Sequence, residues 1–231
     1  MTDVLAAEIL KLRTTRTVWA LLAATLAVTG LAVTGAVYAG AGSDNLDLES
    51  AEGVRTVLHV SASGAIFVLI LGIIISAGEY RQRTATDTFL TTPDRRRVVG
   101  AKLIVGAATG VVFGALSAGV AMFVADHVYD IKGLSFPLGS GDTWSILGGA
   151  VAYAALFGAL GAATGSLVRE QVTAIVGWLA WLFVAENIIV LLGTDVGRWL
   201  PGAAGRALVR EPSDGLLSQP AGGVVLAVWA G

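Results

Sequence analysis

The apolar run Ala65-Ile-Phe-Val-Leu-Ile-Leu-Gly-Ile-Ile-Ile75 lies within 19 consecutive uncharged residues, 60–78. A helix rising about 1.5 Å per residue needs about 20 apolar residues to cross the hydrocarbon core of a bilayer. This stretch therefore predicts a transmembrane helix.

Four further stretches of comparable length carry no charge or a single one: residues 18–42, 103–125, 143–168 and 172–193. A sixth apolar stretch starts near Ala221 and reaches Gly231 after 11 residues, about half the length that a bilayer requires. Residues 1–231 are thus predicted to form a single all-α, polytopic membrane domain. We expect a bundle of six transmembrane helices with the sixth truncated.

The composition agrees with a membrane protein. Of 231 residues, 55% are hydrophobic and 14% charged, and the net charge of −2 argues against a disordered or nucleic-acid-binding chain. There is no cysteine, which excludes disulfides and thiolate metal sites. The 30 glycines suit closely packed membrane helices. Five of them follow G-x-x-x-G spacing and are predicted to pack helices together: Gly106, Gly110, Gly114, Gly161 and Gly165.

The distribution of lysine and arginine predicts the orientation. If the N-terminus is cytoplasmic, ten of the 15 basic residues fall in inner segments and five in outer ones. This bias favours a cytoplasmic N-terminus in a multi-pass membrane protein.

Three segments outside the spans have features of their own. Residues 1–16 carry Leu5, Ile9 and Leu12 on one helical face, which indicates either an amphipathic interface helix or a plain basic flank. Residues 194–220 lie on the predicted outer side and form either a short re-entrant element or an aromatic-anchored loop. Residues 79–97 are the predicted cytoplasmic loop, in which residues 84–90 can form a helical turn or two before Pro93. Phe89 and Leu90 make an apolar tip there that either faces the membrane or docks into a protein groove; we favour docking.

Glu186 is an ionisable residue deep in a predicted span, and Asn187 follows it. A carboxylate in a bilayer is costly, so Glu186 should face the bundle, pair with a polar group or take up a proton. Two interpretations stay open: a gating or pathway residue, and a hydrogen-bonded group that fixes helix packing. We place the packing interpretation slightly ahead.

Enzyme motifs are weak. Ser61-Ala-Ser-Gly64 resembles the serine motif of intramembrane proteases, but Ser61 stands where glycine is expected. His59 and His127 lie at the edges of spans, and no spacing typical of a metal site occurs. We expect no catalytic residue, metal or cofactor on this chain. The phosphate-binding motif of ATPases is also absent, so any ATP-driven work, with ATP and Mg²⁺, would have to be done by another polypeptide.

The chain resembles the ABC-2 type ABC-transporter permeases, of the small actinobacterial kind. The resemblance rests on three segments: Glu8-Ile-Leu-Lys-Leu-Arg-Thr-Thr-Arg-Thr-Val-Trp19, Glu79-Tyr-Arg-x-x-Thr84 with Phe89-Leu-Thr-Thr-Pro93, and Trp181-x-x-x-x-Glu186-Asn187.

The resemblance implies an exporter of an amphiphilic substrate (a drug, lipid, glycan or peptide) that pairs with a second permease, as a homodimer, and with two copies of an ABC ATPase. It also implies that residues 1–16 are an interface helix and that the loop is a coupling helix. The ATPase-coupling residues would be Glu79, Arg81, Thr84, Thr86, Asp87, Phe89 and Leu90. Two alternatives remain: a non-transporting scaffold or self-protection protein and, ranked last, an intramembrane enzyme.

Overall fold

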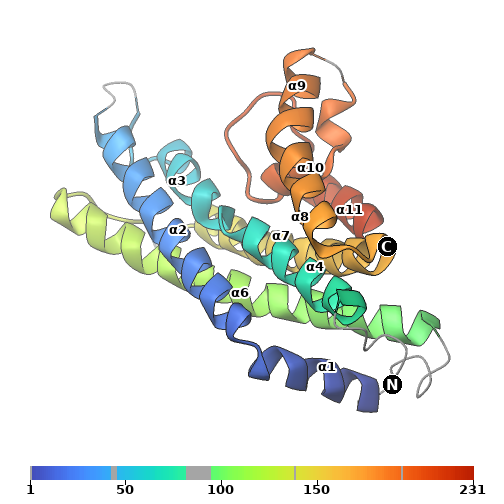
Figure 1. Cartoon of the computed structure of the whole chain (residues 1–231). Helices are drawn as coiled ribbons and strands as arrows, with labels where there is room; N and C mark the ends of the chain where they lie inside the picture. Colours follow the sequence, from blue (N-terminus) through green and yellow to red (C-terminus); the bar gives the residue numbers. More distant parts are fainter. Residues whose placement is uncertain (1, 43–45, 82–94, 138, 194) are drawn as a thin grey trace.

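A computed structural model describes residues 2–42, 46–81, 95–137, 139–193 and 195–231 (Figure 1). Within these ranges the chain is helical and contains no strand. Five helices are long and apolar enough to cross a membrane. The chain is therefore an all-α, polytopic membrane protein, as its sequence predicts.

The five membrane-length helices agree with the predicted spans. The first is α2 (Arg16–Ala41), the third α6 (Arg95–Ile131) and the fourth α7 (Gly141–Val168). The second consists of three consecutive pieces: α3 (Ala51–Leu58), the 3₁₀ turn η1 (His59–Ala62) and α4 (Ala65–Arg81). The fifth also has three: α8 (Gln171–Ala180), the π turn η2 (Trp181–Ala185) and α9 (Glu186–Leu191).

Four short elements complete the fold: α1 (Thr2–Thr14), η3 (Gly197–Trp199), α10 (Pro201–Leu208) and α11 (Gln219–Ala230). The 12 residues of α11 rise roughly 18 Å, which is less than a bilayer core. The described structure thus contains five membrane-length helices and one shorter apolar helix in place of six spans.

Helix α1 is held against α6 by buried charge. Lys102 Nζ on α6 donates to Glu8 Oε1 over 3.2 Å, and Lys11 Nζ donates to the same oxygen over 2.9 Å. Glu8 is 1% exposed and Lys102 is 4% exposed. Because a buried charged pair is held by its partners, the contact between Glu8 and Lys102 fixes α1 on the first turns of α6 (Figure 1).

Helix α7 lies between α4 and α6 and packs against both. The glycines of α6 face α7: a Cβ at Gly106 would meet the backbone of Gly158, one at Gly110 the backbone of Ala154, and one at Gly114 the Cα of Val151. On another face of α7, a Cβ at Gly161 or Gly165 would meet the backbone of α4, at Leu69 and Ile73. The three helices therefore touch backbone to backbone.

The fifth membrane-length helix makes far fewer contacts. Of its most apolar window, 11% is buried against the rest of the chain, compared with 56% for α7. In Figure 1, α8 and α9 (orange) run at an angle to the bundle, with α10 and α11 beside them. Helix α11 packs on α10 and on α7, which joins this part of the chain to the bundle.

We predict that Gly110→Val destabilises the bundle, because even a Cβ at residue 110 would overlap the backbone of α7. Overpacking of this kind costs about 1–3 kcal/mol or more. The matched control is Gly119→Val on the same helix, where a Cβ would meet nothing within 4 Å. Thermal unfolding in detergent should show a lowered midpoint for Gly110→Val and little change for Gly119→Val; equal midpoints for the two variants would contradict this packing.

Candidate functional site

The π turn of the fifth helix brings Trp181 and Glu186 onto one face. In an α-helix, side chains five residues apart point about 140° away from each other. Here the backbone N–H of Glu186 donates to the carbonyl of Trp181, five residues back, which widens the turn. The indole Nε1 of Trp181 then donates to Glu186 Oε1 over 2.9 Å.

Asn187 contributes to the same turn. Its amide Nδ2 donates to the carbonyl of Phe183 over 2.9 Å and to that of Leu182 over 3.3 Å. Both carbonyls belong to the π turn, where the usual i to i+4 bonding is interrupted. Asn187 therefore satisfies backbone acceptors that lipid could not.

Glu186 also accepts a hydrogen bond from α10. The backbone N–H of Gly202, in the first turn of α10, donates to Glu186 Oε1 over 3.0 Å. The first N–H groups of a helix have no partner within the helix, and its N-terminus favours negative charge. Glu186 is 3% exposed, so its carboxylate acts as a buried cap that ties α9 to α10.

A cavity of about 370 Å³ lies beside this carboxylate. Its wall comes from η1 and the start of α4, from the middle of α7, from α9, and from α10 with the residues that follow it. The polar side chains in this wall belong to His59, Ser63, Tyr153, Glu186, Asn187, Arg206 and Glu211. We call this space the Glu186 cavity.

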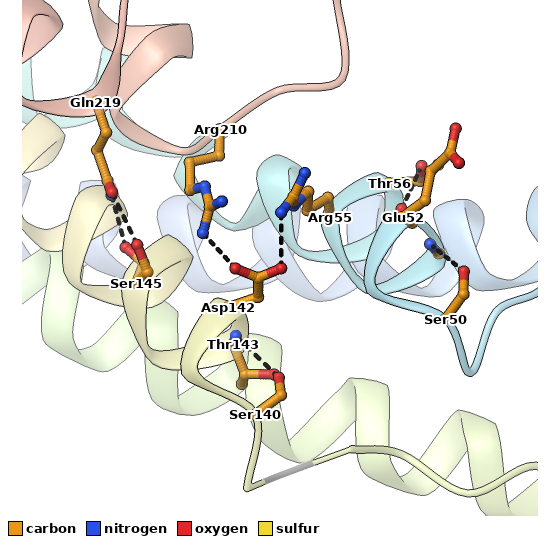
Figure 2. A network of polar contacts seen from close by, with 11 residues as sticks. Ser50, Glu52, Arg55, Thr56, Ser140, Asp142, Thr143, Ser145, Arg210 and Gln219 are labelled. Atoms are coloured by element: carbon orange, nitrogen blue, oxygen red, sulfur yellow. Dashed lines mark hydrogen bonds and ion pairs between the residues drawn. The ribbon is translucent and has the colours of Figure 1, made fainter.

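A network centred on Asp142 holds two walls of the cavity in place. Arg55 of α3 donates to Asp142 Oδ2 over 2.8 Å, and Arg210, just after α10, donates to Oδ1. Figure 2 shows the two arginines reaching the carboxylate from opposite sides. Since His59 follows α3 and Arg206 lies in α10, the network fixes the segments that carry both residues.

A second contact in Figure 2 strengthens this arrangement. The amide of Gln219 at the start of α11 donates to the carbonyls of Ser145 and Leu208, each over 2.8 Å, and its Oε1 accepts from the Ser145 hydroxyl. One side chain thus joins α11, α7 and α10 on the side of the cavity nearest to Asp142.

The fifth helix begins at a tight turn. Arg169 has a left-handed backbone (φ 59°), and Glu170 caps α8 by accepting from the backbone N–H of Thr173 over 2.7 Å. Hydrogen bonding with Thr173 holds the pKa of the exposed Glu170 carboxyl below its usual value. This turn and cap set the direction in which α8 leaves α7, and therefore where the π turn lies.

Ser61, the serine considered for catalysis, is buried, and its Oγ has no hydrogen-bond partner among the described residues. His59 directs Nδ1 at the carbonyl of Arg55 over 3.1 Å. Over the described part of the chain, no group of three or more His, Asp or Glu residues could hold a metal ion.

The residues predicted for coupling fall mostly outside the described ranges. The backbone of Glu79 and Arg81 lies in the last turn of α4, but their side chains are not among those described. Thr84, Thr86, Asp87, Phe89 and Leu90 lie in residues 82–94, outside the described residues.

Sequence reasoning found Glu186 and Asn187 but missed their surroundings. Of the two hydrogen-bond donors to Glu186, Gly202 belongs to α10, and much of the cavity wall comes from α7, η1 and α10, which are remote in sequence. Asp142 directly precedes the predicted fourth span, and no residue near it in sequence indicates its two arginine partners. The spacing Trp181-x-x-x-x-Glu186 is compatible with a hydrogen bond between the two side chains when the turn between them is a π turn, as it is here.

Five described helices are long and apolar enough to cross a membrane, and parts of three of them, together with α10, line the Glu186 cavity. The model of the family described as "ABC-2 family transporter protein" matches residues 4–164, and the chain belongs to this family. The membership supports a membrane permease of an ABC transporter in preference to a catalytic enzyme, and permeases of this family generally work with an ATPase partner. No curated protein and no solved structure gave a significant match.

We predict that Asp142→Asn lowers the stability of the protein, because both arginines lose their counter-charge. The three side chains are 22–37% exposed, so solvent screening limits the loss to about 1 kcal/mol. Thermal unfolding in detergent measures it, with Asp214→Asn, at an exposed carboxylate, as the control. Adding Arg55→Gln to Asp142→Asn should cost little more, and a fully additive loss would show that the network does not act as a unit.

Proposed function

We propose that the chain is the membrane-spanning permease subunit of an ATP-driven exporter of an amphiphilic substrate. A separate ATPase hydrolyses ATP, and this chain provides the path through the bilayer. The observation that carries the proposal is the family match over residues 4–164, which includes α1 and both helices that flank residues 82–94.

The N-terminus is cytoplasmic in this proposal. The ten-to-five distribution of basic residues supports it, since positively charged flanks stay on the inner side. The Glu8–Lys102 pair adds support, because it brings α1 to the start of α6, the helix that follows residues 82–94. Helix α1 and the start of α6 thus lie at the same end of the molecule.

The ATPase contact is proposed to be the coupling segment, residues 84–90. Its apolar pair, Phe89 and Leu90, would enter a groove on the ATPase, and the flanking Glu79, Arg81, Thr84, Thr86 and Asp87 would supply polar contacts. Movement of this segment on ATP binding would be passed to α4 and α6, which are joined to it directly.

A second copy of the permease completes the proposed transporter. The fifth helix supports this step, because only 11% of its most apolar window is buried against the rest of the chain, compared with 56% for α7. Lipid can cover part of that surface, while two copies facing each other would enclose a path between them.

The coupling assignment predicts that Phe89→Asp combined with Leu90→Asp releases the ATPase. Two charges in an apolar groove should reduce recovery of the ATPase expected from the adjacent reading frame at least tenfold in co-purification. The control is Thr91→Asp with Thr92→Asp, which adds the same charge next to the proposed contact and should leave recovery near the parent level. An intact complex with the first pair would contradict the assignment. Self-protection of the cell that persists without ATP hydrolysis and without export would favour a non-transporting role.

The orientation is testable because the chain has no cysteine. We predict that an impermeant maleimide labels Ser213→Cys on intact cells but labels Thr14→Cys only after lysis. Both residues are exposed, so accessibility of the side chain does not differ between the two sites. Labelling of Thr14→Cys on intact cells would reverse the orientation.

A further inference from the structure

The Glu186 cavity carries an excess of negative charge. Among the ionised side chains in its wall, Arg206 and Glu211 face each other over 3.8 Å and offset one another. Glu186 remains, without a cationic side chain bound to its carboxylate among the described residues. An uncompensated buried carboxylate favours a cationic ligand.

The carboxylate is held at the first turn of α10. Its hydrogen bonds from Trp181 and from Gly202 both end on Oε1. Oε2 lies so close to Gly202 that a Cβ there would overlap it. The two donors hold the carboxylate in one orientation, with Glu186 in the wall of the cavity.

The remaining wall suits an organic cation better than a metal ion. Tyr153, Phe157 and Phe183 contribute aromatic rings, which attract alkylammonium and guanidinium groups. A metal ion would require several oxygen or nitrogen ligands, and the described residues offer no such group. The volume of about 370 Å³ is that of a small-molecule site.

An apolar groove lies next to the Glu186 cavity, on the other side of Trp181. Trp181 donates to Glu186 with its indole nitrogen and also lines an apolar groove of about 300 Å³. Trp178 and Trp229 line the same groove. A molecule with a charged end and an apolar body would find both environments within reach of Trp181.

We propose that the Glu186 cavity binds the cationic group, an ammonium or guanidinium, of an amphiphilic organic molecule. The site's part in transport rests on the proposed function. Binding itself needs neither ATP nor the ATPase, so it is measured separately from coupling. If the protein fails to bind the cation but still forms the ATPase complex, only the proposed cation site is wrong. If it binds the cation but forms no ATPase complex, only the proposed coupling is wrong.

The experiment is equilibrium dialysis of the full chain in a neutral detergent against benzyltrimethylammonium, with benzenesulfonate as the anion of similar size. We expect saturable binding of the cation and none of the anion. Glu186→Gln keeps an oxygen for Trp181 and Gly202 but removes the charge. It should weaken cation binding at least tenfold while the unfolding temperature stays near that of the parent.

A second variant tests whether the charge of the cavity wall controls cation affinity, and it leaves the hydrogen bond between Glu186 and Gly202 in place. Arg206→Gln removes the positive charge of the cavity and should tighten cation binding several-fold, while Asp126→Asn, at an exposed carboxylate on α6, should change nothing. Equal binding of cation and anion would overturn the proposal. Unchanged affinity in Glu186→Gln, or weaker binding in Arg206→Gln, would do so as well and would leave Glu186 as a cap of α10.

Discussion

The close contact of α7 with α4 and α6 is the constraint on which the other contacts depend. Glycines at Gly106, Gly110 and Gly161 let these backbones touch, and van der Waals contact of this kind is a main source of helix association in lipid. Helix α7 also supplies Tyr153 and Phe157 to the Glu186 cavity and carries Asp142 in its first turn. A shift of α7 would therefore displace the cavity wall and the Asp142 network together.

The polar side chains of Glu186 and Asn187, in the fifth span, are accommodated by hydrogen bonds within the protein. Glu186 accepts from Trp181 and Gly202, and Asn187 donates to two carbonyls of the π turn. Each of these contacts replaces hydrogen bonds that water would otherwise supply, which lipid cannot do. The two interpretations of Glu186 do not exclude each other, because the carboxylate is hydrogen-bonded to Trp181 and Gly202 and also lines the Glu186 cavity.

The spans could be predicted from sequence because the thickness of the bilayer sets a length that hydrophobicity reveals directly. The π turn could not, since one extra residue in a turn leaves the apolar character of 172–193 unchanged. The partners of Asp142 were equally hidden, because Arg55 and Arg210 are 87 and 68 residues away and meet it only through the packing of α3 and α10. The sequence thus identifies Glu186 as an ionisable residue within a span, and the tertiary structure identifies Trp181 and Gly202 as its hydrogen-bond partners.

Helix α4 connects the two places that the proposed function requires. Its first residues, Ala65 and Ile66, line the Glu186 cavity, and its last turn, with Glu79 and Arg81, leads into residues 82–94. Its 17 residues span roughly 25 Å, and its contact with α7 through Gly161 and Gly165 leaves little freedom to bend. A rigid helix that moves at one end must move at the other. In the proposed transporter, a displacement of the coupling segment would therefore change the cavity wall directly, without any separate relay between the ATPase and the bound substrate.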